Sequence, residues 1–279
     1  MLKAFRMLRY YPGYTLVGAI ILVLTIYGNY ILISRSGWWA IASIVISVLV
    51  WVFFLTSIHP QARLQGRLIT NIPPSWTQNN KPSAYLTFDD GPNLTYTSQV
   101  LRILSDFGVR ATFFPIGINI ERAPEMIAEM ERERHTIGNH SYDHQTFIFR
   151  SRNFIEMELR RTEEAIIKAG GKKPTLFRFP HGFKSFRAIQ IIKEMGYKII
   201  SWNIMPGDWL GLMSDEIVDY IIKNTKDGDI ILLHDGHDTR PDPDRTQTVK
   251  ALPHIIEGLL DRGFSLKCLG EVLNGRENE

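Results

Sequence analysis

Hydrophobic and polar residues are distributed unevenly along the 279-residue chain. Two long apolar runs open it, at about residues 14–33 and 38–58, and neither contains a charged residue. Each run has about the twenty residues that a helix needs to cross the core of a bilayer. The pattern therefore predicts an N-terminal membrane anchor, residues 1–58, made of two transmembrane helices with a short link between them.

After the anchor, residues 59–82 are rich in proline and polar side chains, which is typical of a linker. The rest of the chain, residues 83–279, alternates short apolar runs with longer amphipathic ones. The runs predict strands at 84–88, 111–114, 136–138, 176–179, 198–202, 229–233 and 264–268, and helices at 96–107, 124–134, 153–169, 186–195, 215–226 and 249–261. Such alternation predicts an α/β domain with a mostly parallel sheet, a distorted (β/α)7 barrel.

Charged residues near the apolar runs indicate how the predicted anchor is oriented in the membrane. Only Arg35 lies between the runs, whereas five positive residues lie outside them: Lys3, Arg6, Arg9, Arg63 and Arg67. The positive-inside rule then predicts a multi-pass protein of the cell membrane with both ends in the cytoplasm. A cleaved signal peptide fits less well, because its apolar core is normally shorter and a second long run follows here. A buried hairpin of a soluble protein is the other alternative.

Overall composition excludes some functions. The net charge is only +3, and lysines and arginines are scattered rather than gathered in a stripe, so no nucleic-acid partner is expected. The single cysteine, Cys268, excludes an intramolecular disulfide and a multi-cysteine zinc site. Its position favours a small buried residue in a late strand.

Polar motifs follow several of the predicted strands. Asp89 and Asp90 come directly after the first strand, where an ordinary Asp-Gly turn is the alternative explanation. His140 and His144 follow the third strand, and residues four apart would share one face of a helix. Together with Asp90, these histidines would form a site with two imidazoles and one carboxylate. Three protein ligands leave open positions for water and substrate, as in catalytic metal sites.

Further polar residues lie at later strand ends, where α/β barrels build their active sites. Arg178 could orient a carboxylate through a charge-assisted hydrogen bond, or it could be a surface arginine beside a loop. His234, next to Asp235, is a candidate general acid. Asp208 and Trp209 follow the intervening strand. The complementary chemistry of these groups favours a common site.

These motifs resemble those of the polysaccharide deacetylase family, also called the NodB-homology family or carbohydrate esterase family four. The resemblance covers about residues 83–269. It rests on TFDDGP at 87–92, HSYDH at 140–144, RFPHG at 178–182 and LLHD at 232–235. It implies a metal-dependent hydrolase that removes N-acetyl groups from a glycan containing amino sugars.

The resemblance also implies a role for each site residue. Asp90, His140 and His144 would hold a divalent metal, with zinc expected and cobalt, nickel or manganese as alternatives. Asp89 would be the general base, and His234 would be the general acid. The remaining roles are these: Arg178 orienting Asp89, Asp208 supporting Arg178, Asp235 standing behind His234, Trp209 walling the acetyl pocket, and the backbone N–H of His181 binding the oxyanion.

Two features depart from the family pattern or are not explained by it. The fourth motif usually carries an Asp three residues before the Asp-Trp pair, where this chain has Met205. This departure concerns the local support of Arg178 and not the metal site. The Asp-Pro-rich segment Asp238–Arg245 could shape the substrate cleft, but an ordinary solvated loop is the preferred interpretation.

The expected substrate is an N-acetylated glycan of the peptidoglycan, chitin-like or poly-N-acetylglucosamine type. The apolar segments suggest an alternative, a deacylase of a lipid-linked amino sugar beside the bilayer. An inactive, membrane-bound carbohydrate-binding domain is a further alternative of a different class. Charge counting predicts a cytoplasmic catalytic domain, whereas members of the family usually meet their glycans outside the membrane. The sequence therefore leaves open which side of the membrane the catalytic domain faces. The sequence also leaves the oligomeric state open.

Overall fold

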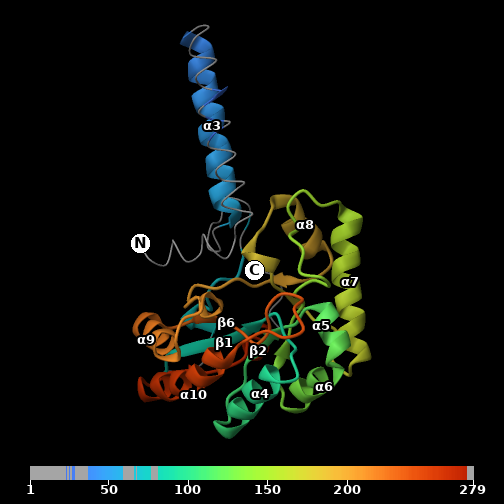
Figure 1. Cartoon of the computed structure of the whole chain (residues 1–279), viewed down its shortest axis with the longest axis vertical. Helices are drawn as coiled ribbons and strands as arrows, with labels where there is room; N and C mark the ends of the chain where they lie inside the picture. The colour runs from blue at the N-terminus through green and yellow to red at the C-terminus, as the bar shows by residue number, and fades with distance from the viewer. Residues whose placement is uncertain are drawn as a thin grey trace. The chain divides into compact units, whose positions relative to one another are not determined.

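The computed structural model of the chain describes residues 23, 25, 27, 28, 37–58, 66, 68–76 and 81–274 (Figure 1). The chain divides into two compact units, Met1–Ile58 and His59–Glu279. In the first unit, α3 (Gly37–Ile58) covers the second of the two predicted apolar helices. The first predicted helix, 14–33, lies almost entirely outside the described residues. Within the described residues, no helix is long and apolar enough to cross a membrane.

The sheet of the second unit is built around β1 (Ser83–Asp89), whose seven residues are all buried. β1 pairs in parallel with β6 (Asp229–His234) along one edge and with β2 (Thr112–Phe114) along the other. β2 pairs in turn with β3 (Thr136–Ile137), and β7 (Ser265–Leu266) pairs with the first residues of β1. A parallel strand covered on both faces is mostly apolar, and in β1 the apolar residues are Ala84, Tyr85, Leu86 and Phe88.

Two further strands, β4 (Leu176–Phe177) and β5 (Lys198–Ile199), pair with each other in parallel. A parallel bridge from Asn139 to Phe177 joins this pair to the end of β3. A second parallel bridge, from Ile204 to Ile231, joins the chain after β5 to β6. The predicted α/β fold with a parallel sheet is therefore confirmed.

Part of the expected linker belongs to this unit. Ile69 bridges Ile200 in parallel, and Asn71 bridges Asp229 in the antiparallel sense. Ile72 is fully buried. The segment 68–76 therefore fills the space between β5 and β6 at one end, which makes the barrel irregular there.

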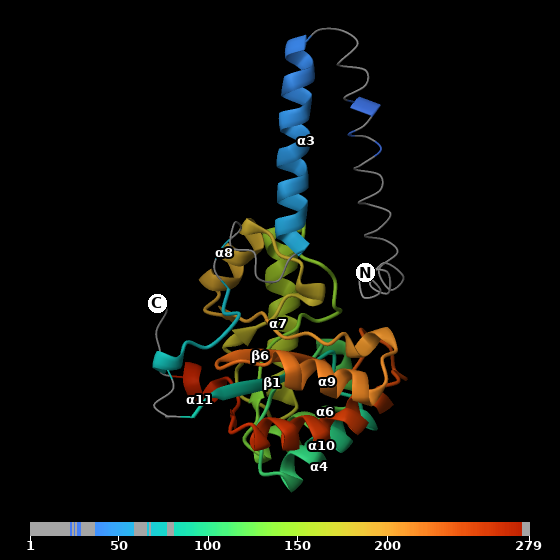
Figure 2. The same ribbon diagram turned by 90° about the vertical axis from the view of Figure 1, so that its left-hand side faces the viewer.

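Helices cover the sheet close to where the sequence predicts them (Figures 1 and 2). Most are amphipathic and bury one face. Their bounds are α4 (Tyr96–Asp106), α5 (Gly117–Arg122), α6 (Pro124–Arg132), α7 (Arg152–Lys168), α8 (Phe186–Glu194), α9 (Ser214–Asn224), α10 (Thr246–Asp261) and α11 (Gly270–Leu273). The short helices α5 and α11 were not predicted, since each is too brief to show an amphipathic period.

Separate apolar clusters hold the two parts of the barrel. One packs α4, α9 and α10 against β1 and β6, which lie side by side in both views (Figures 1 and 2). Another packs α7 and α8 against β4 and β5 and is rich in aromatic rings, with Phe147 stacked on Phe177 at 5.7 Å between centroids. Burial of this kind fixes the strands, and the strands in turn fix the residues at their carboxyl ends.

Candidate metal centre and catalytic site

The register of the central strands brings two motifs together. β1 ends at Asp89, which lies beside His234 of β6 and Phe114 of β2. The next residue, Asp90, has a φ of 72°, so the chain turns sharply at the strand end. Gly236 passes close to this turn, because a Cβ there would lie 2.1 Å from the carbonyl oxygen of Asp90. The first and last motifs therefore meet at one edge of the sheet.

The two histidines do not lie on a helix, so the expectation of a shared helix face is wrong. Residues 139–149 form a loop, in which Ser141 and His144 have φ values of 68° and 62°. Hydrogen bonds to two polar side chains hold this loop conformation. The Asn139 side chain accepts from the backbone N–H of Ser141 at 2.9 Å, and buried Glu158 accepts from the N–H groups of Tyr142 and Asp143 at 2.9 and 3.2 Å.

The loop nevertheless brings the three predicted metal ligands together. Donor atoms of Asp90, His140 and His144 all lie within 4.8 Å of one another, and all three residues are buried. Asp90 Oδ1 lies 3.5 Å from His140 Nε2 and 3.2 Å from His144 Nε2. Two imidazoles and one carboxylate are a suitable donor set for zinc and similar cations.

Hydrogen bonding of this cluster fits a cation as well. Asp90 Oδ1 is buried and has no hydrogen-bond partner, which is costly for a carboxylate oxygen unless an ion binds there. Both histidines use Nδ1 elsewhere, so each Nε2 faces the cluster. Burial would raise the pKa of Asp90, but the neighbouring His144 and His140 hold it well below the ordinary value.

Asp89 is held by Arg178, as expected. Arg178 is fully buried, and its Nη1 donates to Asp89 Oδ1 and to Thr87 Oγ1, each at 2.7 Å. The guanidinium also lies over the ring of Phe114, 4.2 Å from the centroid. These contacts fix the orientation of the Asp89 carboxylate. Its other oxygen lies 3.7 Å from His140 Nε2, beside the metal ligands.

Asp208 supports His234 and not Arg178, which corrects the expected role. His234 donates to it twice, from Nδ1 to Oδ1 and from the backbone N–H to Oδ2, both at 2.9 Å. Thr248 adds a third hydrogen bond to Oδ2 at 2.9 Å. Burial lowers the pKa of His234, but the adjacent Asp208 carboxylate raises it above the ordinary value. Met205, at the position of the missing Asp, packs against an apolar cluster.

Asp235 does not stand behind His234 either. Its Oδ2 accepts a hydrogen bond from Thr97 Oγ1 at 2.5 Å, on the side of α4. The side chain of Asp235 is therefore bonded to α4 and not to His234. Burial raises the pKa of Asp235 to about 7, and the residue lies directly beneath Gly91, where it leaves no room for a Cβ.

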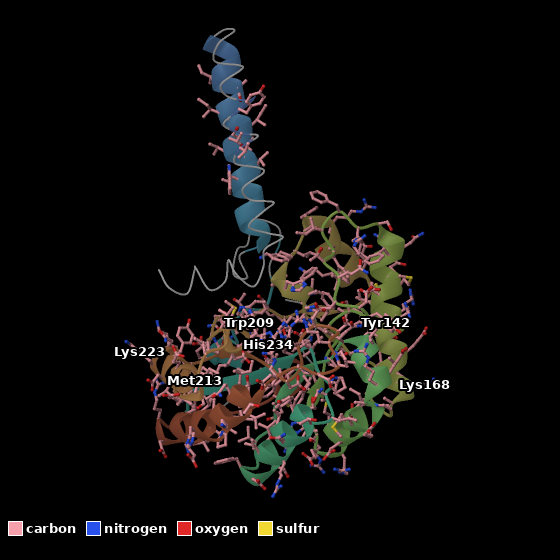
Figure 3. All side chains as sticks on the ribbon, in the orientation of Figure 1. Tyr142, Lys168, Trp209, Met213, Lys223 and His234 are labelled. Atoms are coloured by element: carbon pink, nitrogen blue, oxygen red, sulfur yellow. The ribbon has the colours of Figure 1, made fainter. Side chains whose placement is uncertain are left out.

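The two predicted substrate-binding residues lie beside the site. The ring centroids of Trp209 and His234 lie 4.7 Å apart. Figure 3 shows both side chains on the same part of the domain. His181 has a φ of 55°, and its ring lies 4.3 Å from that of His144. Burial, followed by the charge of His144, lowers the pKa of His181 to about 3.

Sequence reasoning missed Asp238 and Glu158, which contact a metal ligand and the loop that carries it. Asp238 Oδ1 lies 3.1 Å from His144 Nδ1, although the segment that begins there was expected to be solvated. Glu158 lies in the amphipathic helix α7, and only its burial distinguishes it from the other acidic residues there. The available signal in the sequence was an acidic residue on the apolar face of the helix.

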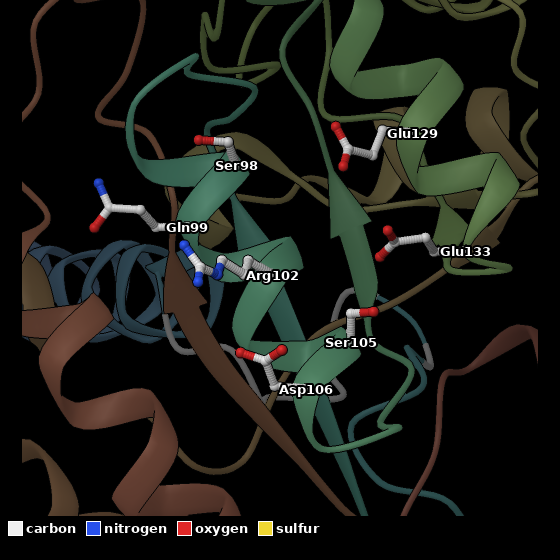
Figure 4. A pocket seen from close by; sticks show the side chains of 7 residues that line it. All are labelled: Ser98, Gln99, Arg102, Ser105, Asp106, Glu129 and Glu133. Carbon is white, nitrogen blue, oxygen red and sulfur yellow. The ribbon is translucent and has the colours of Figure 1, made fainter.

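The polar groove between α4 and α6 is separate from this site (Figure 4). None of the predicted site residues lines it. Its acidic residues are partly neutralised by Arg132, which lies 3.2 Å from Glu129 and 3.7 Å from Glu133. The lining residues are Ser98, Gln99, Arg102, Ser105, Asp106, Glu129 and Glu133.

Comparisons with known proteins agree with the motifs. The family model for polysaccharide deacetylases matches residues 77–200. A peptidoglycan-N-acetylglucosamine deacetylase of Bacillus cereus is 38% identical over 197 residues, covering 70% of this chain and 90% of that protein. A chitooligosaccharide deacetylase of Sinorhizobium fredii is 35% identical over 207 residues, covering 72% of this chain and 95% of that protein.

A solved structure is similar as well. The crystal structure of a peptidoglycan N-acetylglucosamine deacetylase in complex with a naphthalenyl N-oxidanyl-benzamide superposes with a TM-score of 0.66 and 28% identity, covering 75% of this chain and 100% of that one. The residues matched by the family model include the first three of the four motifs. The chain belongs to the polysaccharide deacetylase family.

Proposed function

We propose that this chain is a metal-dependent hydrolase that removes N-acetyl groups from a glycan containing amino sugars. One observation carries the proposal. The Asp90, His140 and His144 cluster lies beside the Asp89–Arg178 pair, and the Asp208–His234 pair follows on the adjacent strand end. Relatives that are 38% and 35% identical to this chain are named as deacetylases of peptidoglycan and of chitooligosaccharides.

Asp90, His140 and His144 would hold the cation, for which zinc is the first choice given two imidazole ligands. When bound, a divalent cation supplies a Lewis acid that polarises the amide carbonyl and lowers the pKa of the attacking water. The protein contributes the arrangement of the ligands, since both imidazole rings are fixed by hydrogen bonds at Nδ1.

Asp89 would be the general base. Arg178 holds its Oδ1, while Oδ2 lies 3.7 Å from His140 Nε2 and thus faces the space next to the metal ligands. From this position Asp89 would accept a proton from the water as its oxygen attacks the carbonyl carbon. The fixed orientation given by Arg178 keeps the second oxygen available for this transfer.

His234 would be the general acid. The Asp208 carboxylate raises its pKa, which favours the protonated form needed to donate a proton to the departing sugar nitrogen. The products would be acetate and a free amine. Trp209 beside His234 would wall the acetyl pocket, and the backbone N–H of His181 would bind the oxyanion.

Acetate release tests this proposal. The protein should release acetate from an N-acetylated glycan, lose that activity with a chelator, and regain it with added zinc. Cobalt, nickel and manganese, added to the same apoprotein, identify the cation that restores most activity. If no glycan yields acetate with any of the four metals, the proposed hydrolase is wrong, and binding of the same glycans then tests the inactive carbohydrate-binding alternative.

The substrate class is the next question. We favour polymeric or oligomeric amino-sugar glycans, because the named relatives act on these. Peptidoglycan, chitin oligomers and a lipid-linked amino sugar should be compared in parallel. A strong preference for the lipid-linked substrate, lost when residues 1–58 are removed, would favour the alternative deacylase instead.

We also propose that the apolar segments in residues 1–58 attach the protein to a cell membrane. The support lies in the sequence of both runs and in α3, where several large hydrophobic side chains are 42–61% exposed: Ile41, Ile44, Val45, Ile46, Val48, Leu49, Val50 and Val52. Membrane fractionation tests the attachment. Topology reporters fused after Pro82 then decide between a cytoplasmic and an external catalytic domain.

A further inference from the structure

The segment after His234 has no role in the mechanism above, yet it contacts the metal ligands. Asp238 makes three hydrogen bonds to the site. Its Oδ1 accepts from His144 Nδ1 at 3.1 Å, and its backbone N–H donates to Asp90 Oδ2 at 2.9 Å. Its carbonyl oxygen accepts from the Asn119 side chain at 2.9 Å, and the same amide group also donates to the carbonyl of Asp90.

The two metal-binding histidines are oriented by different kinds of acceptor. His140 Nδ1 lies 2.9 Å from the backbone carbonyl of Arg178, a neutral group. His144 Nδ1 lies 3.1 Å from the Asp238 carboxylate. In both rings the proton then belongs on Nδ1, which leaves the lone pair of Nε2 for a cation. A carboxylate acceptor does more than a carbonyl, because its charge makes the imidazole a stronger ligand.

The charges of the cluster also indicate that Asp238 helps to bind a divalent cation. Asp89, Asp90 and Asp238 bring three carboxylates to the cluster, and Arg178 brings one guanidinium. With neutral imidazoles, two negative charges remain, which one divalent cation would neutralise. Without Asp238 the cluster would carry only one negative charge.

The segment is built to hold this aspartate in place. Asp238 has a φ of 54°, a conformation that ordinary residues rarely adopt, and the N–H of Thr239 donates back to its Oδ1 at 2.9 Å. Arg122 of α5 donates to the Thr239 carbonyl at 2.5 Å. At the other end of the segment, buried Arg245 donates from Nε to the carbonyl of Gly236 at 2.6 Å. These hydrogen bonds anchor the segment at both ends.

We infer that Asp238 is a positioning residue of the metal centre, which orients His144 through its carboxylate and Asp90 through its backbone N–H. The inference rests on the proposed metal-dependent function. It assigns a role to the Asp-Pro-rich segment, which holds this carboxylate against His144.

Zinc affinity of the apoprotein tests the inference without any substrate. Competition with a chromophoric chelator would give the dissociation constant for the parent, Asp238→Asn, Asp238→Ala and the control Asp242→Asn. Asp242 lies in the same segment and is exposed, so its variant should bind zinc like the parent. Asp238→Ala should bind roughly 10- to 100-fold more weakly. Asp238→Asn should lie between, because an amide oxygen still accepts from Nδ1 but carries no charge.

Two further measurements make the result decisive. Near-ultraviolet circular dichroism of each apoprotein checks that the variants are folded, and His140→Ala identifies the zinc that binds at this cluster. Zinc bound as tightly by folded Asp238→Ala as by the parent would overturn the inference. The proposed function fails independently, if the parent binds zinc at this cluster but releases no acetate from any glycan.

Discussion

The two sides of the site differ in how completely the protein satisfies their buried carboxylates. Asp90 leaves Oδ1 buried without a hydrogen bond, next to two imidazole nitrogens. Asp208 accepts three hydrogen bonds, two from His234 and one from Thr248. An unpaired buried oxygen is costly, whereas a fully bonded one is not. The protein alone therefore leaves the Asp90 carboxylate unsatisfied on the metal side, whereas it satisfies the Asp208 carboxylate on the acid side.

The backbone conformation of the metal side also differs from that of the acid side. On the metal side, Asp90, Ser141 and His144 have φ values of 72°, 68° and 62°. Left-handed conformations of this kind are unfavourable for residues with a side chain and cluster at functional sites. On the acid side, glycines carry the positive φ values, 86° at Gly207 and 70° at Gly211, and His234 ends a regular strand. Unfavourable backbone is thus concentrated where a cation would bind.

Replacing the base gives the largest expected effect and separates metal binding from chemistry. Asp89→Asn should keep the metal, because Asp90, His140 and His144 are unchanged, but it should lose turnover by roughly 10²- to 10⁴-fold. Acetate release and bound zinc should be measured on the same preparation. Full activity in this variant would remove Asp89 as the base. Loss of zinc together with activity would mean that the two aspartates cannot be assigned separate roles.

Replacing the partner of the acid should have an intermediate effect. Asp208→Asn removes the charge that raises the pKa of His234, while burial, which lowers that pKa, remains. The acid must be protonated to act, so activity falls as the pH rises through its pKa. In Asp208→Asn this alkaline limb should move to lower pH, and kcat should fall on the order of 10- to 100-fold.

The measurement is the pH dependence of kcat for the parent and for Asp208→Asn. Zinc affinity serves as the control, because it should be unchanged if the acid side is independent of the metal side. A variant whose alkaline limb stays in place, or moves to higher pH, would contradict the assignment of His234 as the acid.

Much of this architecture could be predicted from the sequence. Alternating apolar and amphipathic runs located the longer helices and the strands, because burial on a parallel sheet imposes those periods. The strand ends located Asp89, Asp90, Arg178 and His234, since parallel strands carry their polar residues at one edge. Cys268 is buried as expected, but the last strand ends at Leu266, so the residue follows that strand and does not lie in it.

Details that depend on side-chain direction and loop geometry could not be predicted. His140 and His144 share a site through a loop with left-handed residues, although their spacing suggested a helix. The family resemblance implies that Asp208 supports Arg178, but its carboxylate bonds to His234, and sequence order does not show which strand end a loop residue reaches. Asp238 looked like part of a solvated segment, and only the fold places it against His144. Contacts between residues so far apart in sequence leave no local pattern.

Removing a single hydrogen bond from the acid side should have the smallest effect. Thr248→Val keeps the shape of a buried side chain but deletes the hydroxyl that donates to Asp208 Oδ2. Asp208 would retain both hydrogen bonds from His234, so the free energy of unfolding should fall by about 1.5–3 kcal/mol, the contribution of one hydrogen bond to a charged group. Urea unfolding measures this loss, and the pH profile of kcat should move slightly or not at all. Thr246→Val, in the same helix, is the matched control, since Thr246 bonds to Tyr96 rather than to Asp208. A shift of the alkaline limb as large as that of Asp208→Asn would show that the pair depends on Thr248, and that the acid side is less self-sufficient than its hydrogen bonds indicate.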